Sequence, residues 1–98
     1  LLRSLVSNLI VHGAIKTTET RAAEAKKMAE KIITLAKKGT VYSRRLVLKL
    51  ITQKDVVKHL FDEVAPKYKE RNGGYTRIYK LGFRKGDAVG VARLELVD

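Results

Sequence analysis

Residues 72–97 read NGGYTRIYKLGFRKGDAVGVARLELV, and this stretch decides the fold class. Asn72-Gly73-Gly74 is a break, residues 75–81 and 91–97 alternate between apolar and polar side chains, and a loop punctuated by glycines separates them. In the last run Ala92, Leu94 and Leu96 share one face. The stretch therefore predicts a C-terminal β-hairpin whose apolar face must be covered by another layer.

The residues before this hairpin show helical periodicity instead. Apolar spacing predicts four helices, over residues 1–12, from residues 18–20 to Gly39, from Thr40 to residue 50, and from residue 53 to near Pro66. The third is expected to use Tyr42 in its apolar stripe and the fourth Phe61, and the fourth should stop because a residue before proline avoids the α region. Residues 14–18 predict a short strand. The fold class is α+β, four helices packed on a small mixed or antiparallel sheet of about three strands.

The charge of the chain indicates the class of partner. The 98 residues, one domain's worth, carry 21 Lys and Arg against 10 Asp and Glu, a net charge of +11. Such a surface seeks a polyanion, and the absence of Trp, with only two Phe, favours nucleic acid over a membrane surface. No apolar run is long enough to span a bilayer, and the chain has no cysteine. We expect a soluble protein that forms a single domain over residues 1–98.

Positive charge is concentrated between residues 67 and 85, where the sequence has seven Lys and Arg but only one Glu. Within this stretch the glycine pair could bring the main chain close to a phosphate, arginine could bind phosphate, and Tyr75 could stack on a base or bond to a ribose. A tight entry into a strand, with Tyr75 half buried, explains the same residues equally well. The candidates here are Arg71, Asn72, Gly73, Gly74, Tyr75, Thr76, Arg77 and Lys80.

Three further groups of residues are candidate contacts for nucleic acid. The basic hairpin tip contributes Arg84 and Lys85, and the third helix contributes Arg44 and Arg45. The third group lies where the predicted strand of residues 14–18 leads into the N-terminus of the second helix. A helix N-terminus is a natural phosphate site. Helix capping would explain Thr18 there, but not the cations; this group is Lys16, Thr17, Thr18 and Arg21. The charged face of the second helix, which includes Lys26, Glu30 and Lys37, is interpreted mainly as solvated.

Catalysis has little support in the sequence. His12 and His59 are the two histidines, the carboxylates Asp62 and Glu63 are adjacent and so point apart on a helix, and no nucleophile or phosphate-binding motif occurs. We predict no enzyme activity, cofactor, metal or small-molecule substrate. An alternative binding function is sequence-specific recognition of double-stranded DNA by a helix-turn-helix formed by residues 40–65, although acidic residues lie on its second helix.

Taken in order, the motifs resemble the L-seventeen family of bacterial large-subunit ribosomal proteins over essentially the whole chain. The resemblance rests on His12-Gly13, residues 15–18 with Arg21-Ala22, residues 35–37, residues 44–46, residues 60–63 with Ala65-Pro66, residues 73–77 and residues 95–97. It implies a structural constituent of the large ribosomal subunit. This constituent would bind the large ribosomal RNA and contact neighbouring large-subunit proteins in the cytoplasm, with an organellar ribosome left open.

The start of the chain departs from the pattern of that family. Its members begin with a strongly basic arm, whereas this sequence opens within a helical pattern and without an initiator methionine. We therefore expect a basic N-terminal segment to precede Leu1.

Overall fold

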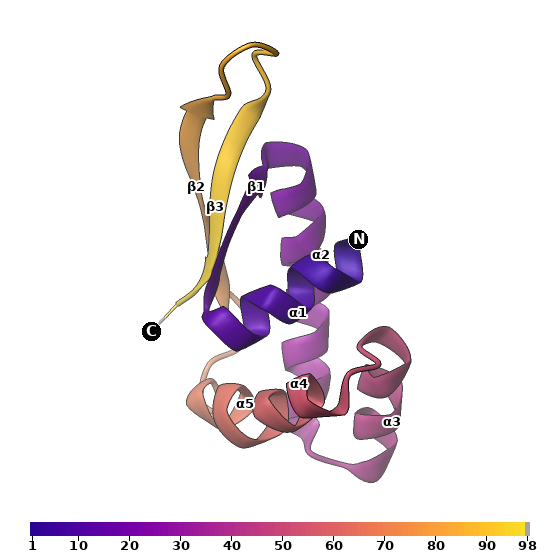
Figure 1. The fold of residues 1–98 in the computed structure, drawn as a ribbon. Coiled ribbons are helices and arrows are strands. Elements are labelled where there is room, and N and C mark those ends of the chain that lie inside the picture. The colour runs from indigo at the N-terminus through magenta and orange to yellow at the C-terminus, as the bar shows by residue number, and fades with distance from the viewer. Residues whose placement is uncertain (98) are drawn as a thin grey trace.

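The computed structural model describes residues 1–97, which form four helical segments and one sheet (Figure 1). The helices are α1 (Leu2–His12), α2 (Glu19–Lys38), α3 (Val41–Leu50) and a continuous run made of α4 (Lys54–His59), η1 (Leu60–Val64) and α5 (Ala65–Lys67). The strands are β1 (Ala14–Thr18), β2 (Thr76–Phe83) and β3 (Gly90–Leu96). The predicted α+β class is confirmed.

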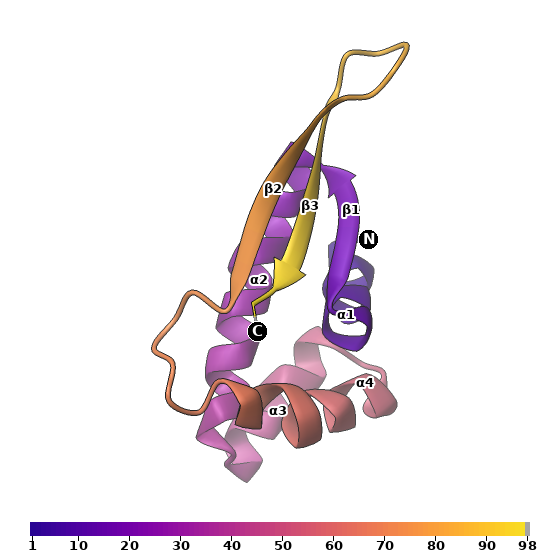
Figure 2. The same cartoon turned by 90° about the vertical axis from the view of Figure 1, so that its left-hand side faces the viewer.

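The sheet is antiparallel with strand order β1-β3-β2, so the last strand lies in the middle. Its inner face carries Ala92 and Leu94, both fully buried, and α2 runs along this face (Figures 1 and 2). Residues paired across antiparallel strands share a face. Successive residues of a strand point to opposite faces, so the positions on β3 that alternate with Ala92 and Leu94, among them Arg93, belong to the outer face of the sheet.

Local capping explains where α2 and α3 begin and where α1 and α2 end. The Thr18 hydroxyl accepts a hydrogen bond from the Arg21 backbone N–H at 3.3 Å, and Thr40 forms a reciprocal capping box with Ser43. Gly13 and Gly39 follow α1 and α2 in the left-handed conformation, with φ of 84° and 66°. That conformation suits glycine because it has no Cβ.

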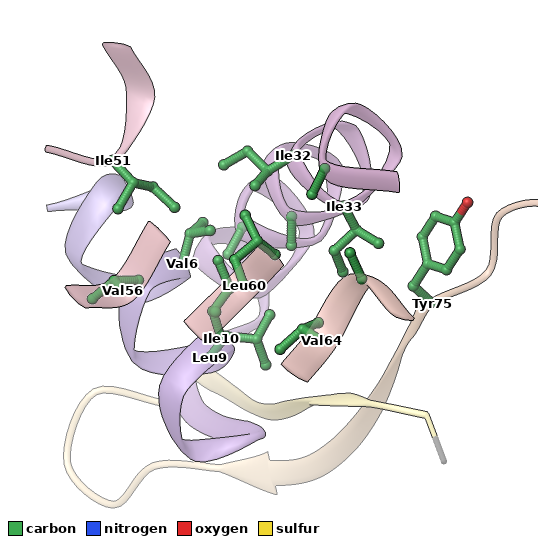
Figure 3. Packing of buried hydrophobic residues seen from close by; sticks show 14 of the residues in the cluster. Val6, Leu9, Ile10, Ile32, Ile33, Ile51, Val56, Leu60, Val64 and Tyr75 are labelled. Atoms are coloured by element: carbon green, nitrogen blue, oxygen red, sulfur yellow. The ribbon is translucent and has the colours of Figure 1, made fainter. Parts of the chain in front are cut away.

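The hydrophobic core lies where α1, α2 and the fourth helix meet (Figure 3). Val6, Ile32, Ile33 and Leu60 are all fully buried there. Two core predictions need correction. Tyr42 is 71% exposed because the inward face of α3 is formed by Ser43 and Val47, four residues apart, and Tyr42 lies off this face. Phe61 is only partly buried, because the neighbouring Leu60 takes the inward position on the fourth helix.

The fourth helix ends at Lys67, near Pro66 as predicted, but the residue before the proline does not leave the α region. Ala65 adopts helical angles (φ −60°, ψ −42°), and the chain remains helical to Lys67. The reason is the turn of π-helix at Leu60–Val64, in which the Ala65 N–H donates to the Leu60 carbonyl. We attribute the passage of the helix through Pro66 to this wider turn, which relieves the crowding that a proline ring causes in a regular α-helix.

The β2–β3 hairpin projects well beyond the helices, giving the molecule extents of 47 × 26 × 17 Å (Figure 2). β2 runs two residues further than the predicted alternation, to Phe83, because a bulge between Lys80 and Gly82 allows pairing to resume. Among the described residues, no helix combines the length and the apolar character needed to cross a membrane.

Candidate nucleic-acid interface

The double glycine at residues 73 and 74 leads into a backbone site that already holds an anion. Both glycines have positive φ, and the N–H groups of Tyr75 and Thr76 that follow donate to the Glu30 carboxylate at 3.3 and 2.8 Å. The Thr76 hydroxyl donates to the same carboxylate at 2.7 Å, and Lys26 donates to the Thr76 carbonyl at 2.7 Å. The predicted anion-binding bend therefore binds a carboxylate of α2 at these N–H groups.

Tyr75 lies inside the protein, where it is only 2% exposed. Its ring centroid lies 5.3 Å from that of Tyr68, and its hydroxyl accepts a hydrogen bond from Lys37 at 2.9 Å. Burial acts to raise the pKa of the Tyr75 hydroxyl, but hydrogen bonds from Lys37, the Gly73 backbone and Thr34 outweigh it and leave this pKa below 10.0. These contacts match the interpretation of a tight strand entry, so Tyr75 and Thr76 are removed as candidate RNA contacts.

The rest of this loop remains at the surface. Arg71 is exposed, and its Nε donates to the Gly74 carbonyl at 3.0 Å while Lys37 donates to the Arg71 carbonyl. Asn72 and Gly74 are exposed and Gly73 is half-buried. Arg71 therefore both shapes the loop and presents charge beside it.

A depression of about 460 Å³ beside the end of β2 next to the hairpin tip joins two predicted contacts that are far apart in sequence. We call it the hairpin cleft; its lining residues are Lys16, Thr17, Thr18, Arg21, Leu81, Gly82, Phe83, Arg84 and Val91. Lys16 and Arg21 are exposed, and neither forms an ion pair with any residue that the structure describes. Their charges are therefore available to a ligand.

The outer face of the sheet continues the basic surface from the cleft. Lys16, Arg93 and Tyr79 lie side by side in one row across the three strands, because Lys16 and Tyr79 both pair with Arg93. Arg77 lies in the next row on this face and donates a hydrogen bond to the Tyr79 hydroxyl at 3.0 Å. Arg93 forms an ion pair with Glu95 at 3.0 Å. The sequence analysis did not propose Arg93 or Tyr79 as contacts, although the alternation of Arg93 with the apolar residues Ala92 and Leu94 could have identified the first of them.

The hairpin tip carries less available charge than its composition suggests. Arg84 forms hydrogen bonds to both Asp87 oxygens, the shortest of 2.6 Å, and the Val89 N–H also donates to Asp87. The hydrogen bond from Arg84, followed by that from Val89, lowers the pKa of Asp87 below 3.8, and the same ion pair raises the pKa of Arg84. Lys85 is thus the cation of the tip without such a partner among the described residues.

The remaining predicted contacts lie apart from the hairpin cleft. Lys80 is exposed and lies 3.8 Å from Glu19, an acidic residue in the first turn of α2. Arg44 and Arg45 are exposed on α3, at the opposite end of the molecule from the hairpin tip (Figure 1). The Arg44 guanidinium lies 4.8 Å from the centroid of the Phe61 ring, and this cation–π contact holds the Arg44 side chain against the fourth helix.

The helix-turn-helix alternative gains no support from the structure. Its second helix is the long fourth helix, with Asp62 held by Lys58 at 2.6 Å and Glu63 also exposed. The hydrogen bond from Lys58 lowers the pKa of Asp62, so this helix carries ionised carboxylates at neutral pH, which would repel DNA phosphates. Among residues 1–97, no group of His, Asp and Glu side chains could hold a metal ion.

Comparison with known proteins identifies the chain. The model of the family "Ribosomal protein L17" matches residues 1–97. A protein of Clostridium acetobutylicum named large ribosomal subunit protein bL17 is 60% identical over 97 residues, covering 99% of this chain and 85% of the relative. Proteins of the same name from Clostridium perfringens and Clostridium botulinum are each 59% identical over 97 residues, covering 99% of this chain and 86% of the relative.

A compact α+β body with a projecting basic hairpin and a match to a ribosomal family over its length defines the class as a ribosomal protein. Within that class, the chain belongs to the ribosomal protein L17 family. The resemblance drawn from the sequence motifs is confirmed.

Proposed function

We propose that this protein is a structural constituent of the large ribosomal subunit that binds the large ribosomal RNA through the hairpin cleft and the outer face of the sheet. The observation that carries the proposal is the meeting of Lys16 and Arg21 with the hairpin in one basic depression. Family membership supports it, because the relatives are named as proteins of the large ribosomal subunit.

The proposed mechanism is electrostatic anchoring on a surface of defined shape. Lys16 and Arg21 would neutralise phosphates and release counterions, a contribution that does not depend on base sequence. The row formed with Arg93 would extend that contact along a strand of RNA, and the rigid sheet would determine its register.

The other cationic sites are proposed as secondary contacts around the same RNA. They are Arg44, Arg45, Arg71, Arg77, Lys80, Arg84 and Lys85, together with the loop residues Asn72, Gly73 and Gly74, and the cleft residues Thr17 and Thr18. We further propose neighbouring large-subunit proteins as partners and the cytoplasmic ribosome as location. The proposal contains no catalytic step, in line with a family of ribosomal proteins.

The experiment measures binding of the full chain to large ribosomal RNA at several salt concentrations. Replacing Lys16 and Arg21 together by alanine should weaken binding and reduce the slope of log affinity against log salt by about 1.5, as expected for two lost phosphate contacts. The matched control replaces Lys31 and Lys54, two exposed lysines of α2 and α4, which removes the same charge away from the cleft.

Equal losses in the two double variants would show that net charge alone drives binding and would overturn the assignment of the cleft. Preference for double-stranded DNA over ribosomal RNA at equal salt would instead favour the helix-turn-helix alternative.

A further inference from the structure

Phe83 presents an unusually open aromatic ring for a residue within a strand. It is 77% exposed, and neighbouring Leu81 is 52% exposed. Its partner across the sheet is Gly90, which has no side chain to cover the ring. Single exposed apolar residues are common, but this ring also lines a depression with cations around it.

The shape of the strand keeps Phe83 at the cleft. The bulge between Lys80 and Gly82 and the positive φ of Gly82 (107°) change the direction of the last residues of β2. The first turn of α2 also crowds Gly90, since a Cβ at this position would lie 1.8 Å from the Glu19 carboxylate. A larger residue opposite Phe83 would thus require Glu19 to move.

The cations of the cleft come from two different elements. Lys16 lies on β1 and Arg21 in the first turns of α2, and both line the same depression as Phe83. An aromatic face together with unpaired cations is the combination that binds a nucleotide, because the base stacks and the phosphate is neutralised.

We propose that the hairpin cleft binds one unpaired nucleotide of the RNA, with its base stacked on Phe83 and its phosphate held by Lys16 and Arg21. This inference rests on the proposed function and specifies the form of RNA that the site takes. Both faces of a base within a duplex are covered by adjacent base pairs, so only a looped-out or single-stranded base can stack on the ring. The volume of about 460 Å³ lies within the range of small-ligand sites.

The absence of tryptophan from the sequence allows a direct test of stacking. Phe83→Trp introduces a single fluorescent reporter at the proposed contact. Single-stranded oligoadenylate should quench its emission, whereas the same RNA annealed to oligouridylate should not at equal salt. Val11→Trp, at an exposed position of α1 outside the proposed RNA contacts, is the matched control and should not be quenched by either RNA.

A second measurement tests the energetic contribution of the ring. Phe83→Ala should bind single-stranded oligoadenylate roughly ten-fold more weakly than the unmodified protein, the loss expected for one stacked base. The high exposure of Phe83 means that the substitution removes little packing, and circular dichroism checks that the fold is retained.

The outcomes separate this inference from the proposed function. Salt-dependent binding of ribosomal RNA by the unmodified protein, without quenching of Phe83→Trp and without a loss in Phe83→Ala, would overturn the stacking site alone. Failure of the unmodified protein to bind ribosomal RNA would overturn the proposed function itself.

Discussion

At the scale of single residues, Glu30 has a role that its position on a charged helix face does not reveal. Its carboxylate accepts hydrogen bonds from the N–H groups of Tyr75 and Thr76 and from the Thr76 hydroxyl. Lys26 and Lys37, on the same helix, donate to the carbonyls of Thr76 and Arg71. The charged face of α2 thus orients the start of β2.

Replacing Glu30 by alanine should destabilise the protein by about 2–3 kcal/mol, because partly buried backbone donors lose a charged acceptor. Urea denaturation measures the change. Glu24→Ala, an exposed position on the same helix, should alter the free energy of unfolding by less than about 0.5 kcal/mol. Similar small effects of both substitutions would contradict the assigned role of Glu30.

The ion pair at the hairpin tip predicts a pH dependence with a definite sign. The folded-state pKa of Asp87 is lowered below 3.8 by Arg84 and the Val89 N–H. The pair therefore stabilises the tip above the unfolded pKa and is lost as the pH falls through the lower, folded pKa. An NMR titration of the Asp87 carboxyl should give a midpoint below 3.8, and Arg84→Ala should raise it. A midpoint unchanged by Arg84→Ala would remove this ion pair as the cause.

At the scale of secondary-structure elements, the end of the fourth helix is joined to the end of β3 through Tyr68. This residue is buried, packs against Tyr75, and donates its hydroxyl proton to the Val97 carbonyl. The π-helical turn lets the helix pass through Pro66, and Tyr68 follows as its C-cap. The helix therefore connects the helical layer to the last strand.

Tyr68→Phe should cost about 1–2 kcal/mol in the free energy of unfolding, because the buried Val97 carbonyl loses its donor while the ring is retained. Thermal or urea unfolding checks this value. The matched substitution Tyr79→Phe removes a hydroxyl from the exposed outer face and should change stability little. If both variants were equally stable, the hydroxyl of Tyr68 would have no structural role.

At the scale of the whole molecule, the helices that hold most of the core and the hairpin tip lie at opposite ends of a long axis (Figures 1 and 2). The large buried residues belong to the helices and the sheet, whereas residues 84–88 are all exposed. The core that stabilises the fold and the proposed main RNA contact, the hairpin cleft, consequently lie in different parts of one chain.

This separation predicts that the tip can be shortened without loss of the fold. Replacing residues 84–89 by Asn-Gly, which favours a two-residue hairpin turn, should change the free energy of unfolding by no more than about 1 kcal/mol. Binding to large ribosomal RNA, measured alongside urea denaturation, should weaken because Lys85 is removed. Unfolding of the shortened protein would show that the tip supports the core.

The helices and strands were predictable because their signals are local. The cap at Thr40 depends on Ser43 three residues away, and the left-handed ends at Gly13 and Gly39 depend on single residues. The end of the fourth helix near Pro66 was predicted, but the helical conformation of Ala65 was not, because the π-turn that precedes it is not encoded in the residue before proline.

The sequence by itself determined the α+β class, the strongly basic charge and the family, since periodicity, composition and ordered motifs are properties of the linear chain. Only the tertiary structure decided that Tyr75 and Thr76 are internal, because their partner Glu30 lies 45 and 46 residues away. Only folding brings Lys16 and Arg21 beside Phe83, as β1 and β2 both pair with β3. Contacts between distant residues follow from packing, which local patterns do not specify.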